Sequence, residues 1–440
     1  MKKSVIYFIA GLLLAGGLLG WLYFSHYLEL EKPQIELKRE ISFIGKNKKV
    51  EITFSDQKSG ISHVKLEIVQ DEKKQKLLNR KIPSRGKTQI ITSLTIDATT
   101  ANLVDGPATL IISAADYSLF RNKKVLSVPV TIDTKPPQIL IFSKANYITQ
   151  GGTCFIAYRV SKAVETSGIF VNDYFTPGYR KEISGNPLHV VYFALPLEAT
   201  RENTRIDVYA LDEAGNEART SLPFFIRERK TRKDSVVLDK SFLQFKMPEF
   251  ERAMPELQGK SHAEIFKFIN SQMRKDNDRT IRDICRVSAK KKLWEGAFLR
   301  MREAATMAKF GDEREYIIAG KKYGASVHLG IDLASTAQAP IEAANHGIVV
   351  FSGKLGIYGN TVIIDHGHGL SSLYAHLSVI ETSAGKEVKK GERLGYSGTT
   401  GLAGGDHLHF SVLAGGRFVN PLEWWGRRWI ENNVYKKIDF

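Results

Sequence analysis

The chain has 440 residues, with 63 lysine or arginine and 47 aspartate or glutamate residues, so its formal net charge is +16. A charge of this size favours anionic surroundings or simply keeps a protein soluble. No nucleic-acid-binding motif accompanies the basic residues, so we expect no nucleic-acid partner. The two cysteines, Cys154 and Cys285, fall in different predicted domains. We expect both to be buried free thiols.

An uncharged, mostly apolar run from Val5 to Phe24 follows Lys2 and Lys3. A helix rising about 1.5 Å per residue would let this run cross a bilayer core of about 30 Å. We therefore predict a cytoplasmic tail and transmembrane anchor over residues 1–29. The protein would be a single-pass protein of the cytoplasmic membrane, with most of the chain in the periplasm or on the outer side. A cleaved signal peptide is the alternative, although the apolar run is longer than the usual signal core of about 7–15 residues.

The region after the anchor repeats short motifs at a spacing of about 100 residues, which matches the size of an immunoglobulin-like sandwich domain. Pro33-Gln34-Ile35 recurs as Pro137-Gln138-Ile139, and the acidic turn at 113–117 has a counterpart at 209–216. Segment 64–68 alternates apolar and polar residues, as half-buried strands do.

These patterns predict two immunoglobulin-like β-sandwiches, over residues 30–133 and 134–228. They would form a spacer rod or a plain scaffold. The acidic turn Asp212-Glu213-Ala214-Gly215-Asn216 has too few ligands for calcium.

The alternation stops at a charged run, and a helical connector is predicted over residues 229–307. Segments 263–269 and 293–307 carry apolar residues at three- and four-residue spacing, which is typical of helices. Pro248 and Pro255 should interrupt the first part. The connector is either a plain link or a regulatory segment that packs on the following domain.

Histidines concentrate near the C-terminus, where seven of the eleven lie between His328 and His409. In an extended strand, His407 and His409 point to the same face, while Leu408 points to the other. His328 and Asp332 are separated by three residues, and Gly330-Ile331 among them favours a strand running into a bend over a helical turn.

A catalytic zinc site needs three nitrogen or oxygen ligands and one open position. His328, Asp332 and one histidine of the later pair supply this set, and the other histidine is free for proton chemistry beside a metal-bound water. His376, at the end of a probable strand, would hydrogen-bond a developing oxyanion. The alternative is a set of ordinary histidines in a β-rich domain. The remaining histidines of this segment are expected to be turn or supporting residues outside the ligand set: His346, His366 and His368.

Between Phe310 and Pro421, roughly a quarter of the chain, the sequence resembles the lysostaphin-type family of zinc peptidoglycan endopeptidases. The resemblance rests on four motifs: His328-Leu329-Gly330-Ile331-Asp332, Tyr358 to Gly367, Leu373-Tyr374-Ala375-His376-Leu377-Ser378 and His407-Leu408-His409-Phe410. Asp406 and Ser411 depart from the usual family residues, which puts the groove shape in doubt and leaves the chemistry intact.

The resemblance implies one zinc ion bound by His328, Asp332 and His409. It also implies that His407 acts as the base and that His376 stabilises the tetrahedral intermediate. The implied domain is an antiparallel β metallopeptidase over residues 308–425, followed by a tail at 426–440.

The fold class expected for the whole chain is therefore multidomain and mainly β: a transmembrane helix, two sandwiches, a helical connector and the metallopeptidase domain. The implied function is hydrolysis of peptide bonds in peptidoglycan stems or cross-bridges, during cell-wall biogenesis or cell division. Peptidoglycan would be the main partner, beside the membrane bound through the N-terminal helix, and a regulatory protein partner is left open. Because the family includes members that lost their ligands, the alternative is a non-catalytic protein that binds the wall or activates another hydrolase. The aromatic tail around Trp424 should pack on the catalytic domain or sit at a membrane interface.

Overall fold

The computed structural model describes residues 2–142, 146–183 and 185–438, in two compact units. Unit 1 comprises the chain up to Gln138 together with Lys162–Glu165 and Leu211–Ala218, and unit 2 comprises the rest. Parts of three predicted ranges, 1–29, 134–228 and 426–440, lie outside the described residues. The predicted domain boundaries themselves stay predictions.

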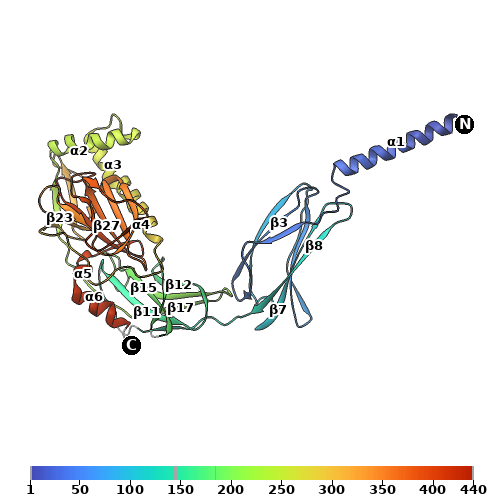
Figure 1. Ribbon diagram of the computed structural model, residues 1–440, viewed down its shortest axis with the longest axis horizontal. Helices are drawn as coiled ribbons and strands as arrows, with labels where there is room; N and C mark the ends of the chain where they lie inside the picture. Colours follow the sequence, from blue (N-terminus) through green and yellow to red (C-terminus); the bar gives the residue numbers. More distant parts are fainter. Residues whose placement is uncertain (1, 143–145, 184, 439–440) are drawn as a thin grey trace. The chain divides into compact units, whose positions relative to one another are not determined.

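Helix α1 spans Lys2–Phe24 (Figure 1), so the helix expected at the N-terminus is present and begins earlier than the apolar run. Within the described residues, no helix combines the length and the apolarity that a membrane span requires. The transmembrane anchor predicted over residues 1–29 is therefore not confirmed.

Unit 1 contains two sheets that share one hydrophobic core (Figure 1). The first sheet has the order β1-β3-β6, with bounds Gln34–Leu37, Lys48–Ser55 and Gln89–Ile96. The second has the order β2-β8-β7-β4-β5, with bounds Phe43–Ile44, Lys123–Ile132, Gly106–Asp116, Ile61–Gln70 and Lys73–Lys81. Val64, Leu66 and Ile68 are fully buried, which confirms the alternation predicted for this strand. The immunoglobulin-like topology stays a prediction.

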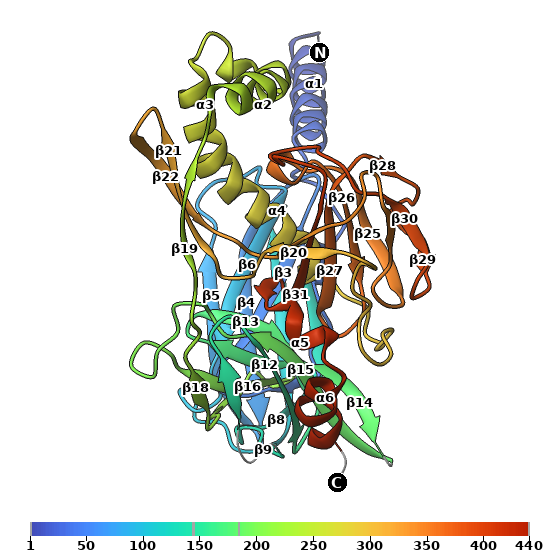
Figure 2. The same ribbon diagram turned by 90° about the vertical axis from the view of Figure 1, so that its left-hand side faces the viewer.

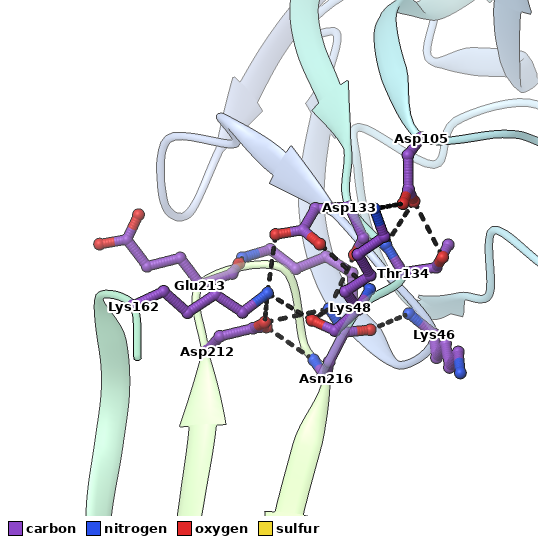
Figure 3. Close-up of polar contacts among 10 residues, drawn as sticks. Lys46, Lys48, Asp105, Asp133, Thr134, Lys162, Asp212, Glu213 and Asn216 are labelled. Carbon is purple, nitrogen blue, oxygen red and sulfur yellow. Dashed lines mark hydrogen bonds and ion pairs between the residues drawn. The ribbon is translucent and has the colours of Figure 1, made fainter. Parts of the chain in front are cut away.

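A polar network in unit 1 surrounds the acidic turn at 212–216 (Figure 3). Asn216 accepts a hydrogen bond from the Lys46 amide at 2.9 Å and donates to the Asp133 carbonyl at 2.7 Å. The ammonium of Lys162 pairs with the carboxylates of Asp133 and Asp212 at 2.8 and 2.6 Å. The buried Asp212 carboxylate is thereby neutralised by an ammonium within the protein.

Residues 139–221 also form two sheets around a core, as far as the structure describes them. One has the order β14-β15-β11-β9, with bounds Tyr179–Ile183, Asn186–Ala194, Thr153–Val160 and Ile139–Ile141. The other has the order β13-β12-β16-β17, with bounds Tyr174–Pro177, Val164–Val171, Ile206–Asp212 and Glu217–Ser221. Strands β10 (Tyr147–Thr149) and β18 (Phe225–Arg227) form a separate parallel pair. Cys154 and Cys285 are free and buried, as predicted.

The connector contains helices, as predicted, but also strands. Helix α2 spans Lys240–Ala253, α3 spans His262–Phe268, and the π-helical turn η2 (Ile269–Met273) leads into α4 (Arg274–Arg286). A short 3₁₀ turn, η1 (Pro255–Leu257), separates the first two. Strand β19 (Lys233–Val237) pairs in parallel with β21 (Glu313–Ile318). Pro248 lies inside α2, so the expectation that it breaks the helix is wrong.

The helix expected over 293–307 is also wrong. Residues 287–304 are irregular, and Ala305–Ala308 form strand β20. The apolar spacing has a different cause: Trp294 and Phe298 are buried in the core of the C-terminal region. The backbone there bonds to other segments, as in Phe298 N to Trp424 O at 2.9 Å, instead of to itself. Tertiary packing thus overrides the helical pattern.

The C-terminal region is built on one large, mainly antiparallel sheet (Figure 2), with the order β20-β23-β31-β27-β26-β25-β29 and β32 paired to β31. The bounds after β20 are Ile331–Ala334, Leu408–Ala414, Leu370–Leu377, Asn360–Asp365, Gly347–Lys354, Glu387–Val388 and, for β32, Arg417–Val419. A small sheet, β24-β30-β28, comprises Pro340–Glu342, Arg393–Tyr396 and Val379–Ile380. The hairpin β21 (Glu313–Ile318) and β22 (Lys321–Val327) lies between β20 and β23 in the chain, and η3 (Gly356–Tyr358) joins β25 and β26.

Helices α5 (Pro421–Trp425) and α6 (Arg427–Asn433) and the turn η4 (Tyr435–Lys437) end the described chain. Trp424 is fully buried in the same core as Trp294, so the expected packing of the aromatic tail on the catalytic region is confirmed. Phe155 and Tyr192, from the β11–β15 sheet, belong to this core as well.

Glu423 on α5 should make the stability of unit 2 depend on pH. Its carboxylate accepts a hydrogen bond from Thr153 N at 2.7 Å, and burial raises its pKa to about 8 from an ordinary 4.5. The folded state therefore keeps a proton that the unfolded chain has lost. The contribution of Glu423 to the free energy of unfolding should be greatest below about pH 4.5 and should fall as the pH rises towards about 8.

We predict that Glu423→Gln removes most of this decrease, because an amide oxygen accepts the same hydrogen bond without ionising. Urea denaturation at about pH 5 and about pH 8 measures the effect, with Glu431→Gln at an exposed position as the control. An equal loss of stability in Glu423→Gln and in the unaltered protein would contradict the assignment.

Candidate metal centre and active site

Three potential metal ligands come from two adjacent strands and the bend before them. His328 lies between β22 and β23, Asp332 lies in β23, and His409 lies in β31. The antiparallel register places Asp332 directly opposite His409. The bend between β22 and β23 confirms the predicted strand-and-bend conformation of the first motif. Gly330 is needed there, because a Cβ atom would lie 2.5 Å from Nε2 of His409.

The donor atoms of these three residues converge on one point. His328 Nε2 and His409 Nδ1 each lie 2.9 Å from Asp332 Oδ1, and the two nitrogens lie 3.0 Å apart. All three residues are buried: His328 is 7% exposed, Asp332 is 8% exposed and His409 is 5% exposed. Two imidazole nitrogens and one carboxylate oxygen this close together match the donor set and compactness of a zinc site with bonds of about 2.0–2.2 Å.

A second close group of possible ligands, Glu29, Asp56 and Asp116 in unit 1, contains carboxylates alone. Its oxygens already accept hydrogen bonds from protein groups, including Ser59 N to Glu29 at 2.9 Å and Gly60 N to Asp56 at 2.8 Å. Imidazole ligands favour zinc, and all-carboxylate sets favour harder cations. The histidine group is therefore the zinc candidate.

Neighbouring groups fix the two ligand imidazoles. His328 Nδ1 donates to the Lys309 carbonyl at 3.0 Å, which leaves Nε2 unprotonated towards the metal position. His409 Nε2 lies 3.0 Å from the Ser411 hydroxyl, which itself donates to the Leu329 carbonyl at 2.9 Å. Because that hydroxyl proton is committed, His409 Nε2 is the donor, and its Nδ1 is free to ligate. Such contacts fix ring orientation and tautomer.

Arg314 on β21 is a functional candidate that the sequence interpretation missed. Its Nη2 lies 3.2 Å from Oδ2 of Asp332, the carboxylate oxygen that does not face the two imidazoles. It orients the carboxylate so that Oδ1 faces the metal position. Arg314 precedes Asp332 by 18 residues on a different hairpin, so no local spacing pointed to it.

The protonation states suit metal binding, which needs an ionised carboxylate and neutral imidazoles. Burial alone would raise the pKa of Asp332, but hydrogen bonds and charges from His328 and His409 hold it well below its usual value. Burial lowers the pKa of His409 to about 4, despite the opposing effect of the Asp332 carboxylate.

His376 and His407 flank the three ligands. Their rings are 4.8 Å apart, and His407 Nε2 lies 3.6 Å from Asp332 Oδ1. His376 Nδ1 donates to the Thr400 carbonyl and His407 Nδ1 to the Gly405 carbonyl, each at 2.8 Å. Both rings therefore present an unprotonated Nε2 when neutral. Burial, together with the charges of His407 and His409, holds the pKa of His376 well below its usual value.

The structure thus brings together all five residues predicted from the sequence. The other three histidines of the segment lie outside the ligand set, as predicted. His366 is fully buried and bonds through Nδ1 to the His346 carbonyl and through Nε2 to the Ser372 hydroxyl, both at 2.7 Å. His368 Nε2 lies 3.0 Å from the Lys290 carbonyl.

Comparison with known proteins identifies the region that carries this site. The model of peptidase family M23 matches residues 326–421. The DD-carboxypeptidase/endopeptidase Mpg of Neisseria meningitidis serogroup B is 42% identical over 96 residues, which are 22% of this chain and 22% of Mpg. The peptidoglycan DD-endopeptidase ShyA of Vibrio cholerae serotype O1 is 38% identical over 96 residues, with the same shares. The C-terminal region of the chain is a peptidase family M23 domain.

The match spans 22% of the length of these relatives, so it concerns this domain alone. Among solved structures, the catalytic domain of lysostaphin from Staphylococcus simulans is 25% identical, with a TM-score of 0.25. The comparison covers 30% of this chain and 98% of that domain. The match to the peptidase family M23 model confirms, at the level of the domain family, the resemblance noted from the motifs.

Gly330→Ala tests the geometry of the ligand group. The added methyl group would force the His409 ring away from His328 and Asp332, so we expect zinc affinity to fall by about tenfold or more. Chelator-competition titration measures this change. Gly405→Ala is the matched control, since nothing lies within 4 Å of its Cβ position. Equal zinc affinities for the two variants would contradict the geometry.

Proposed function

We propose that this protein is a zinc-dependent endopeptidase that hydrolyses peptide bonds in peptidoglycan stem peptides or cross-bridges. The observation that carries the proposal is the convergence of two imidazoles and one carboxylate beside two further histidines. The M23 match supports a peptidase, and the activities in the names of Mpg and ShyA support peptidoglycan as the substrate class.

His328, Asp332 and His409 would hold one zinc ion, with a fourth position for water or substrate. Zinc bound there supplies a Lewis acid that polarises a carbonyl group and makes water reactive near neutral pH. Arg314 keeps the Asp332 carboxylate oriented for this role.

The histidines beside the ligands would move the protons. Nε2 of His407 accepts a proton from the attacking water, because Nδ1 already carries a proton that is bonded to the Gly405 carbonyl. In neutral His376 the proton lies on Nδ1, bonded to Thr400. His376 therefore stabilises a developing oxyanion only once Nε2 also carries a proton.

Peptidoglycan lies outside the cytoplasmic membrane, so we place the working protein in the periplasm or on the outer side of the membrane. The excess of basic side chains suits a substrate whose stem peptides carry carboxylates.

The decisive experiment digests purified sacculi with the zinc-loaded protein and separates the muropeptides. We expect cross-linked products to decrease. His407→Ala should abolish cleavage while zinc stays bound, because His407 lies outside the ligand set. His409→Ala should lose zinc as well as activity. His262→Ala, on α3, is the control and should cleave normally.

Unchanged cross-linking with the fully zinc-loaded protein would contradict the proposal. A cellular phenotype that persists in His407→Ala although cleavage is lost would instead favour a non-catalytic role, in which the domain binds the wall or activates another hydrolase.

A further inference from the structure

Lys246, on helix α2, is buried beside the loop 397–407, which connects β30 to β31 and contains His407. Leu243, Lys246, Met247 and Phe250 form the buried face of α2, and Lys246 is 3% exposed. Its Nζ donates a hydrogen bond to the Thr399 carbonyl. Across the described chain, no carboxylate pairs with this ammonium.

A lysine at such a position is energetically unfavourable. Lysine is almost never fully buried unless it is paired, and an uncompensated buried ammonium is costly. Burial accordingly lowers the pKa of Lys246, and the charge of Glu249 only partly opposes this effect. An apolar side chain would cover the same helix face without that cost, so packing alone does not account for a lysine here.

The Thr399 carbonyl is the middle one of three consecutive carbonyl groups, and each of the three accepts a hydrogen bond from His376, His407 or Lys246. The Gly398 carbonyl accepts the backbone N–H of His407 at 3.2 Å. The Thr399 carbonyl accepts Nζ of Lys246, and the Thr400 carbonyl accepts Nδ1 of His376 at 2.8 Å. The peptide held by Lys246 is thus the one that places both histidines beside the zinc ligands.

The same loop is held from its other side. Thr400 Oγ1 accepts the Asn360 amide and donates to the Leu377 carbonyl, each at 2.9 Å. Leu402 N donates to the Ile357 carbonyl at 2.8 Å. These partners lie within residues 326–421, which the M23 family model matches, whereas Lys246 lies outside them.

Helix α4 contacts a second loop of the site, the one that contains Ile357 and Tyr358. Asn277, on α4, accepts the Ile357 amide at 2.9 Å, and Tyr358 donates to Asp278 at 3.2 Å. The Tyr358 ring lies 5.5 Å from the His409 ring. Helices α2 and α4 therefore support both loops that border the histidines.

We propose that Lys246 is a positioning residue for the peptidase reaction: by holding the Thr399 carbonyl it fixes the 398–400 peptide and so the orientations of His376 and His407. The inference rests on the proposed function. It makes helix α2, which lies outside the M23 match, part of the apparatus that orders the active site.

The test compares Lys246→Met with the unaltered protein on a purified cross-linked muropeptide dimer. Methionine keeps the length and packing of the side chain and removes the donor. We expect kcat to fall about tenfold to a hundredfold, with KM changed by less than about threefold and zinc content unchanged. The midpoint temperature of thermal unfolding should be unchanged or slightly higher. Lys240→Met, at an exposed position of the same helix, is the matched control and should behave as the unaltered protein.

A second readout does not depend on activity. In ¹⁵N spectra of the imidazole rings, His376 and His407 of the zinc-loaded protein should each show the single tautomer with the proton on Nδ1. In Lys246→Met, the His376 signals should show a mixture of tautomers or broadening. If the unaltered protein cleaves no muropeptide, the proposed function fails, and the ring spectra alone decide the role of Lys246.

Two results would overturn the proposal. One is a folded Lys246→Met protein with unchanged kcat and unchanged ring spectra. The other concerns Lys246→Arg, which keeps a charged donor and should recover most of the lost kcat. Equal impairment of the arginine and methionine variants would show that side-chain packing matters and hydrogen-bond donation does not. The arginine variant also keeps the idea testable if Lys246→Met fails to fold.

Discussion

The pairing of strands β23 and β31 is the constraint on which the site depends. Because Asp332 and His409 are directly opposite in the register, their side chains leave the same face of the sheet at adjacent positions. The bend at Gly330 then brings His328 to the same point, since a larger residue there would collide with His409. A one-residue slip would turn His409 to the other face and separate the donors.

The candidate site is completed by segments outside residues 326–421, which the family model matches. Arg314, from the preceding hairpin, contacts Asp332, and Lys246, from helix α2, contacts Thr399. The irregular segment with Trp294 and Phe298 packs into the catalytic core, and Phe155 and Tyr192 of the β11–β15 sheet join that core. The matched domain therefore works as part of a larger structure in unit 2.

The sequence was sufficient for those features that local spacing determines. Alternation predicted the strand with the buried Leu66, and the spacing of His407 and His409 predicted that both imidazoles lie on one face, where both now lie beside Asp332. Features that depend on distant contacts were missed. Trp294 and Phe298 imitate a helical pattern because both are buried in a core built by other strands. The roles of Arg314 and Lys246 depend on hydrogen bonds to residues of other segments, which local spacing does not reveal.

The central claim is that His328, Asp332 and His409 form one zinc site. Zinc anomalous diffraction from crystals of the full chain, with metal content measured on the same preparation, tests it most directly. We predict one zinc ion per chain, bound by one nitrogen of each imidazole and by Asp332 Oδ1 at about 2.0–2.2 Å. A folded protein that binds no zinc, or that binds it away from these three residues, would contradict this assignment.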